Sequence, residues 1–361
     1  MKKVLPIFVF IILCAIAAPL FARAAAKPLS YAAWVPYWKK AGGSAEALAH
    51  LNSLNELSPF SYEVKPDGTI TDTMKINNDP WPVLLAAART AKVKIIPTIS
   101  WVNGDQIQAT LVSSSARTAH INAIVSIVAS SGFDGIDIDY ENKKAETNLP
   151  FALFIKALSI ALHDKGKVLS CTIEPRTPLA DRFVKPPKTI EYANDYVTIN
   201  RRCDSVRILT YGQSTIDLQL NRAKGGTTVY APVADDVWVK KVLAETTKTI
   251  KPGIIMLGVP TFGYEYELTK SGKLYQYKKL RSVTYKQATD LTASVAATPV
   301  RNIAGELSFT YQQATSTRLV WYADAAVVVD KVALAKRYGL RGVAVFKIDG
   351  EDDTVLWKAL K

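Results

Sequence analysis

Cysteine, histidine and methionine are scarce in this chain, with three of each among its 361 residues. The histidines, His50, His120 and His163, lie far apart in segments of helical pattern and form no ligand cluster, so we expect neither a metal site nor a cofactor. Internal repeats, low-complexity linkers and basic runs interleaved with aromatic residues are also lacking, which argues against repeat arrays and nucleic-acid binding. Disordered and fibrous classes are excluded because 48% of the residues are hydrophobic and only 21% are charged.

The N-terminus has the pattern of a secretory signal. Two lysines precede an apolar run over residues 4–21, and Ala22-Arg23-Ala24 supplies a small-residue cleavage site. We therefore expect residues 1–26 to be removed and residues 27–361 to form one domain that is secreted or held in the cell envelope. The alternative is an uncleaved anchor, which would be the chain's only contact with a membrane.

Export would leave two cysteines, Cys171 and Cys203, which could form a disulfide or remain a free buried pair. Loss of the signal's three positive residues would lower the formal net charge from +13 to +10. A basic secreted protein favours anionic partners such as peptidoglycan, teichoic acids or membrane surfaces. The sequence gives no sign of an oligomer, and we expect a monomer.

Strand-like runs alternate with helical ones along the chain, which predicts βα units and a parallel sheet. The eight predicted strands are 31–38, 58–64, 93–100, 134–141, 167–173, 205–211, 254–260 and 341–348. Eight such units favour an α/β fold of the closed (β/α)8 TIM-barrel type. The interval after the seventh strand, about residues 264–318, is too long for a loop, and its alternating Tyr, Lys and Thr residues predict a small α+β insertion.

The most informative segment is Asp134-Gly135-Ile136-Asp137-Ile138-Asp139-Tyr140-Glu141. At strand period, Asp137, Asp139 and Glu141 share one face at spacings of about 6–7 Å, and their repulsion raises the pKa of at least one of them. A solvated edge strand is the alternative interpretation. A purely acidic stripe that ends where a helix follows instead favours catalytic residues at the carboxyl end of a barrel strand.

These eight residues match the D-G-x-D-x-D-x-E signature of glycoside hydrolase family 18, the chitinase-like enzymes, and the likeness extends over roughly residues 30–358. The resemblance implies catalysis in which the substrate's own 2-acetamido group is the nucleophile. Glu141 would be the acid and base, Asp139 would hold the acetamide, and Asp137 would tune its neighbour. Tyr211, at the end of the sixth strand, matches the family tyrosine that bonds the acetamide oxygen.

Sugar-binding residues are expected among the aromatic residues at strand ends, because sugar rings stack on flat apolar faces. The candidates are Tyr37, Phe60, Trp101, Trp321 and Phe346, together with Gln213 as a polar substitute in the loop after Tyr211. Two of them mark departures from the family pattern. Phe346 stands where the family usually has tryptophan, and Gly212-Gln213 stands where it has Asp or Asn.

The third strand lacks the Ser-x-Gly-Gly of chitinases, and Phe60-Ser61-Tyr62 resembles the bacterial branch near spore-germination and cortex-lytic hydrolases. We therefore expect a glycoside hydrolase that cleaves β-1,4 linkages of N-acetylglucosamine-containing glycans, with peptidoglycan or a related wall glycan as substrate. A chitinase acting on chitin or chito-oligosaccharides is one alternative. A non-catalytic chitinase-like sugar-binding protein is another, although it would typically have lost Glu141.

Overall fold

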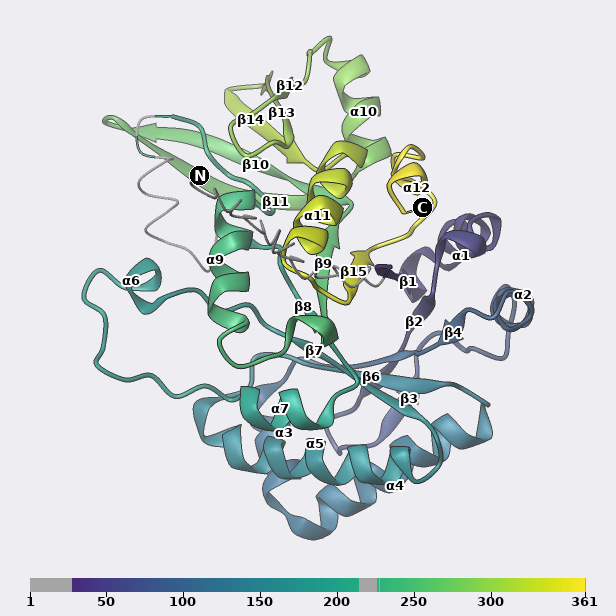
Figure 1. The fold of residues 1–361 in the computed structure, drawn as a ribbon. Coiled ribbons are helices and arrows are strands. Elements are labelled where there is room, and N and C mark those ends of the chain that lie inside the picture. Colours follow the sequence, from purple (N-terminus) through teal and green to yellow (C-terminus); the bar gives the residue numbers. More distant parts are fainter. Residues whose placement is uncertain (1–27, 214–225, 227, 361) are drawn as a thin grey trace, which may run out of the picture.

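The structure is a computed structural model that describes residues 28–213, 226 and 228–360. The predicted signal, residues 1–26, lies outside the described residues. The chain forms an eight-stranded parallel barrel surrounded by helices, with a second sheet above one side of it (Figure 1). This confirms the predicted TIM barrel with a small α+β insertion.

The barrel is closed by hydrogen bonds between its first and last strands. Its strands, in sheet order, are β1 (Ser30–Pro36), β15 (Gly342–Phe346), β9 (Ile255–Pro260), β8 (Ser205–Ile208), β7 (Val168–Ile173), β6 (Gly135–Tyr140), β5 (Thr98–Trp101) and β2 (Glu56–Val64). β2 pairs with β1 and so closes the ring. β2 also pairs in parallel with the short strand β4 (Lys94–Ile95) and antiparallel with β3 (Ile70–Asp72). Each of the eight predicted strands therefore corresponds to a strand of the barrel.

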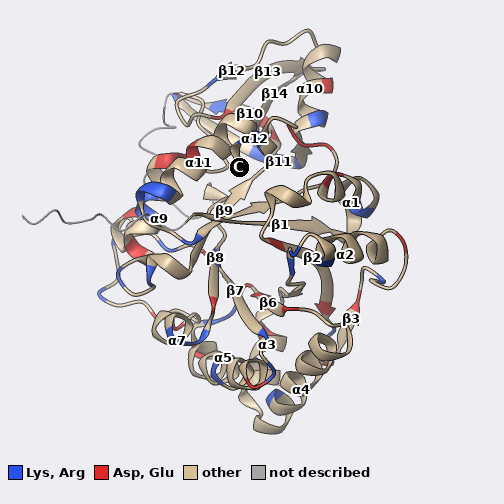
Figure 2. Ribbon diagram, turned by 45° about the vertical axis from the view of Figure 1, so that its right-hand side comes forward, with Lys and Arg blue, Asp and Glu red and all other residues tan. Residues whose placement is uncertain are grey.

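An outer layer of helices covers the barrel strands. It comprises α1 (Lys40–Ala49), α2 (Trp81–Thr90), α3 (Gly104–Val112), α4 (Ser114–Ser130), α5 (Asn148–His163), α7 (Tyr196–Arg202), α9 (Asp236–Thr246) and α11 (Ala325–Arg337), with the short α6 (Leu179–Arg182) and α12 (Leu356–Ala359) at the edges. Basic and acidic residues are interspersed over these helices and the connecting loops (Figure 2). The interface between helices and strands is built from buried aliphatic and aromatic side chains.

α5 lies within a segment, Ala145–His163, that is long and apolar enough to span a membrane by composition. In this fold, however, α5 packs against the barrel through side chains that are fully or almost fully buried. They include Phe154, Ile155, Leu158 and Leu162. Its apolar composition is therefore that of a core helix.

Two local features determine how neighbouring strands meet. Gly135 begins β6, and a Cβ atom there would lie 2.2 Å from the backbone oxygen of Val168 on β7, so only glycine allows this approach. Cys171 in β7 and Cys203, just before β8, form a disulfide. The sequence left this pairing open, and the structure links the two strands covalently.

The insertion is an antiparallel five-stranded sheet that continues directly from β9. Its order is β11 (Leu274–Thr284), β10 (Phe262–Ser271), β14 (Ser316–Tyr322), β13 (Leu307–Gln313) and β12 (Val300–Arg301), with α10 (Tyr285–Ser294) between β11 and β12. Because β10 begins two residues after β9 ends, the sheet rises from the carboxyl ends of the barrel strands. It therefore forms a wall beside the mouth of the barrel (Figure 1).

Candidate active site

Strand β6 presents its acidic residues to the inside of the barrel. Asp137 and Asp139 are 0% and 5% exposed and pair in register with Thr98 and Ser100 of β5. The alternate residues face the helices, where the Tyr140 hydroxyl lies 2.5 Å from His120 Nε2. The two faces of the strand are therefore divided as its alternating sequence predicts.

Asp137 is held by donors from three strands. The hydroxyls of Thr98 and Thr172 donate to its carboxylate at 2.9 and 3.0 Å, and Arg207 Nη1 lies 3.5 Å from Oδ2. The Thr98 hydroxyl also accepts a 2.9 Å bond from the Trp34 indole. The hydroxyl proton of Thr98 is therefore available to donate to Asp137. These bonds fix the carboxylate at the base of the acidic row.

Arg207 is a completely buried cation in the middle of the barrel. It donates to Ser58 Oγ at 2.7 Å and to Glu56 Oε2 at 3.2 Å. Glu56 also accepts a 2.7 Å bond from Arg341. Burial alone would raise the pKa of Glu56, and the two arginines overcome this and lower it. The chain therefore forms a buried ionic network, Glu56–Arg207–Asp137, below the site.

Asp139 and Glu141 titrate above their ordinary ranges. Burial, followed by the charges of Glu141 and Asp137, raises the pKa of Asp139 well above its usual value. Burial and then the charge of Glu174 raise the pKa of Glu141, and Lys143 opposes this. Asp139 Oδ1 is buried and has no hydrogen-bond partner among the described residues. The site thus pairs a carboxyl group of raised pKa at Glu141 with an acceptor atom at Asp139 that has no partner among the described residues.

Glu174, which follows β7, is the third carboxylate of this cluster. It accepts a 3.2 Å bond from the Asn142 backbone and a 2.7 Å bond from the Asn194 amide, and it lies 3.5 Å from Lys143 Nζ. Lys143 is almost completely buried over the Phe151 ring and donates to the Tyr140 backbone oxygen. The Glu174–Lys143 pair therefore sets the electrostatic environment of Glu141.

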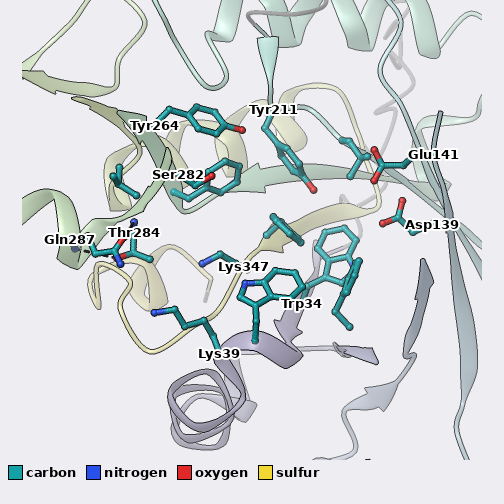
Figure 3. Close-up of a pocket in the computed structure, with 16 residues that line it drawn as sticks. Trp34, Lys39, Asp139, Glu141, Tyr211, Tyr264, Ser282, Thr284, Gln287 and Lys347 are labelled. Atoms are coloured by element: carbon teal, nitrogen blue, oxygen red, sulfur yellow. Dashed lines mark hydrogen bonds between the residues drawn. The ribbon is translucent and has the colours of Figure 1, made fainter. Parts of the chain in front are cut away.

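The acids open into a cavity of about 470 Å³ with an aromatic lining (Figure 3). The Tyr211 ring stacks on Phe346 at 5.5 Å and 21°, and its hydroxyl points into the cavity on the side of Asp139 and Glu141. Burial and the nearby carboxylates raise the pKa of Tyr211 well above its usual value, so the hydroxyl remains a donor. The other aromatic lining residues are Trp34, Trp38, Phe60, Phe262 and Tyr264.

The end of the cavity farthest from the acids is polar. Lys39 pairs with Glu351 at 2.5 Å, and Lys347 pairs with Asp349. The insertion contributes Ser282, Thr284 and Gln287 to this end (Figure 3). The barrel therefore supplies the acids, and the insertion supplies much of the opposite wall.

Comparison with known proteins places the chain in a family. The family model for glycosyl hydrolases family 18 matches residues 33–351. The uncharacterized glycosylase YvbX of Bacillus subtilis (strain 168) is 24% identical over 330 residues, which cover 87% of this chain and 88% of YvbX. The chain belongs to glycosyl hydrolase family 18. It is a glycoside hydrolase, as the acidic strand indicated.

Solved structures show the same fold. A chitinase from Chromobacterium violaceum matches with a TM-score of 0.73 and 23% identity, over 92% of this chain and 98% of that one. The spore cortex-lytic enzyme SleL of Bacillus cereus matches with a TM-score of 0.73 and 21% identity, over 92% of this chain and 73% of SleL. Both comparisons show that this chain shares its overall fold with a chitinase and with a cortex-lytic enzyme.

Five of the predicted site residues lie together in the cavity lining: Asp139, Glu141, Tyr211, Phe60 and Phe346. Asp137, which was also predicted, lies below Asp139 inside the barrel. Phe346 is at the centre of the aromatic lining, with ring-centroid distances of 5.7 Å to Trp34 and 6.0 Å to Phe262. The structure therefore brings the predicted acids and the predicted tyrosine to one place.

Three predicted sugar contacts are wrong because their side chains are buried elsewhere. Trp101 is 3% exposed and packs on His120 outside the barrel. Trp321 is 1% exposed and packs against Tyr230. Gln213 is completely buried, and its amide donates to the Tyr230 hydroxyl at 2.9 Å. A sugar ring cannot reach any of the three.

Tyr37 also lies outside the cavity lining, and its neighbour Trp38 takes the expected position. β1 ends at Pro36, and Tyr37–Lys39 form a 3-10 turn in which Tyr37 packs against the core and Trp38 is 48% exposed. The alternation of the strand already favours this assignment. Trp38 has the parity of Trp34, which lines the cavity, and Tyr37 has that of Val35, which faces the helices.

Several site residues were not predicted from the sequence. Arg207 lies four residues before Tyr211, so in a strand the two side chains point to the same face. A charged residue on that face of an apolar strand could have indicated that Arg207 belongs to the site. Glu174 directly follows a barrel strand, where catalytic residues are expected. Among the described residues, no group of three or more His, Cys, Asp or Glu side chains is placed to hold a metal ion.

Proposed function

We propose that this enzyme hydrolyses the β-1,4 bond that follows N-acetylglucosamine in peptidoglycan or a related wall glycan, by substrate-assisted retaining catalysis. One observation carries the mechanism. Among the described residues that line the cavity, the carboxylates are Asp139 and Glu141, both from the end of one strand and both on one side (Figure 3). Retaining enzymes with a protein nucleophile need two carboxylates that flank the bond. This arrangement supports a nucleophile supplied by the substrate.

The first step breaks the glycosidic bond. The 2-acetamido oxygen attacks the anomeric carbon of its own sugar while Glu141 gives its proton to the departing glycosidic oxygen. The raised pKa of Glu141 favours the protonated form that this step needs. Asp139 Oδ1 accepts from the acetamide N–H, and the Tyr211 hydroxyl donates to the acetamide oxygen. The cyclic oxazolinium ion that forms lies next to the carboxylate left on Glu141.

The second step restores the sugar. The Glu141 carboxylate removes a proton from a water molecule as the water oxygen attacks the anomeric carbon. The bond between that carbon and the acetamide oxygen breaks, so the product keeps its original configuration and Glu141 regains its proton. Asp137, bonded to Thr98 and Thr172 and facing Arg207, lies below Asp139 and holds the base of the acidic row in place.

Wall glycan is favoured as substrate by two observations. The formal net charge of +10 that remains without the signal suits an anionic polymer, whereas chitin is neutral. The cortex-lytic enzyme SleL shares the fold. Secretion is part of the proposal, and the Cys171–Cys203 disulfide supports it because disulfides persist in oxidising compartments.

Chitin is the second candidate substrate, because a chitinase shares the fold over nearly the whole chain. The two candidates are separated by incubating the purified protein with peptidoglycan sacculi and with chitotetraose and identifying the products by mass spectrometry. We expect fragments with N-acetylglucosamine at the reducing end from sacculi. Products from chitotetraose alone would establish the chitinase.

The non-catalytic alternative is tested in the same assay. Glu141→Gln should abolish turnover and preserve sugar binding, because the amide fills the same space and cannot supply a proton. If the unmodified chain binds either glycan without cutting it, the catalytic proposal fails and a sugar-binding protein takes its place.

A further inference from the structure

A second, smaller hollow lies outside the main cavity, beside the segment that follows Glu141. Its volume is about 150 Å³, and its polar lining is Lys143, Glu174, Arg176, Arg182, Tyr192 and Asn194. None of these residues lines the main cavity. Glu141 lines the main cavity, and Lys143, two residues later, lines the smaller hollow. The Asn142 backbone between them donates to Glu174 of the smaller hollow at 3.2 Å. The segment after Glu141 therefore connects the cavity to this hollow, which we call the arginine pocket.

The pocket is built from the segment that follows β7. This segment extends outward from the barrel, carries the short helix α6, and returns to α7 (Figure 1). Arg176 lies between two tyrosine rings, with its guanidinium carbon 3.9 Å from the centre of Tyr192 and 3.6 Å from that of Tyr196. Its Nη2 donates to the Asn194 backbone oxygen. The guanidinium is thus held in one plane before any ligand arrives.

Arg182 approaches the same tyrosine. Its guanidinium carbon is 5.8 Å from the centre of the Tyr192 ring, and Nη1 donates to the Tyr192 hydroxyl at 3.3 Å. Burial and the nearby charge of Arg182 both lower the pKa of Arg176, so the two cations repel each other. Tyr192 is therefore flanked by two like charges.

Neither arginine is neutralised by an ion pair with a described residue. The one carboxylate in the lining, Glu174, pairs with Lys143 at 3.5 Å, which leaves the charges of Arg176 and Arg182 in excess. Arg176 makes one hydrogen bond to described residues, so most of its donors are unused. A planar guanidinium with free donors fits a carboxylate in a two-bond geometry.

We infer that the arginine pocket binds the carboxylate-bearing substituent of the sugar that departs from Glu141. This inference rests on the proposed function, in which that sugar lies beyond Glu141 from Asp139. In peptidoglycan, the sugar after N-acetylglucosamine carries a lactyl ether, and its carboxyl is either free or extended by an acidic peptide. Chitin has no anionic substituent, so the pocket would make this enzyme selective for wall glycan.

Binding of three probes tests the inference. The probes are chitobiose, the disaccharide of N-acetylglucosamine and N-acetylmuramic acid, and the same disaccharide carrying its pentapeptide. Affinities are measured by calorimetry in a Glu141→Gln background, which prevents turnover. The first probe is neutral, the second has the lactyl carboxylate, and the third has carboxylates on the peptide alone. The acidic probe that binds more tightly identifies the source of the carboxylate.

Arg182→Gln should lower the ratio of acidic-probe affinity to chitobiose affinity about tenfold, because a charge-assisted hydrogen bond is lost. Lys185→Gln is the matched control. It removes one positive charge from an exposed position in the same segment, outside the pocket lining, and should leave the ratio unchanged. The preference for acidic probes should also weaken at about 1 M salt, where charges are screened within about 3 Å.

The inference would be overturned if Arg182→Gln and Lys185→Gln had the same ratio of acidic-probe affinity to chitobiose affinity. It would also be overturned if the Glu141→Gln protein without either change bound no acidic probe better than chitobiose. A fall in affinity for all three probes alike would show a structural role for Arg182 and would also overturn it. The proposed function fails separately, if the unmodified enzyme cuts neither sacculi nor chitotetraose.

Discussion

Replacing Arg207 with methionine should destabilise the protein by about 3–5 kcal/mol, the range for removing one partner from a buried ion pair. Glu56 and Asp137 are 1% and 0% exposed, and both face the Arg207 guanidinium. Methionine fills the space and leaves two buried carboxylates with one cation fewer. The lower half of the range is expected, because Arg341 still bonds Glu56 and two threonine hydroxyls still bond Asp137.

The unfolding free energy lost in Arg207→Met should decrease as the pH is lowered. The lowered pKa of Glu56 in the parent contributes stability that is present above its ordinary value of 4.5 and is lost as pH falls. Without Arg207, burial dominates and the pKa of Glu56 rises, so the carboxyl takes up a proton in the folded state. The difference in unfolding free energy between parent and Arg207→Met should therefore be largest near neutral pH and should shrink toward pH 4.

Urea unfolding followed by circular dichroism at several pH values measures this difference. For a domain of this size, a loss of about 3 kcal/mol corresponds to a fall of about 4 °C in the melting temperature. Arg341→Met is the control, because Arg341 is 31% exposed and its pair with Glu56 should contribute about 1 kcal/mol or less. An Arg207→Met protein within 1 kcal/mol of the parent at neutral pH would refute the account of the buried network.

Three further predictions concern the site and its support. Glu174→Gln removes a charge that raises the pKa of Glu141, so the basic limb of the kcat/KM profile should move to lower pH, and an unmoved limb would exclude this coupling. Replacing Cys171 and Cys203 with serine opens a loop with a sequence separation of 32 residues and should cost about 3–4 kcal/mol in urea unfolding, whereas unchanged stability would show that the bridge adds nothing. Phe346→Ala removes the ring stacked on Tyr211 and should lower kcat/KM about tenfold or more in steady-state assays; an unchanged value would exclude Phe346 from sugar binding.

The sequence predicts the barrel and the acidic strand well, because both depend on local periodicity. The alternation of Asp137, Asp139 and Glu141 with isoleucines determines which side chains face inward, whatever the rest of the chain does. The choice of Tyr37 over Trp38 did not follow this periodicity. Trp38 has the parity of Trp34 and lines the cavity with it, whereas Tyr37 has the parity of Val35 and packs on the helix side.

Predictions from residue type alone failed where packing decides burial. Trp101 and Trp321 have the chemistry of sugar platforms, but they fill space between elements that are distant in the sequence. The Glu56–Arg207 pair joins residues 151 positions apart, and no local pattern predicts that pairing. The ionic network below the site could therefore be found only from the three-dimensional structure.

The central claim is that the substrate's acetamide, activated by Asp139 and Tyr211, is the nucleophile. The most direct test measures kcat for aryl chitobiosides whose reacting acetamide carries zero, one, two or three fluorine atoms. Each fluorine makes the carbonyl oxygen less nucleophilic, so the account predicts a steep decline in kcat along the series. A rate that is nearly independent of fluorine number would show that the acetamide does not attack, and would contradict the roles assigned to Asp139 and Tyr211.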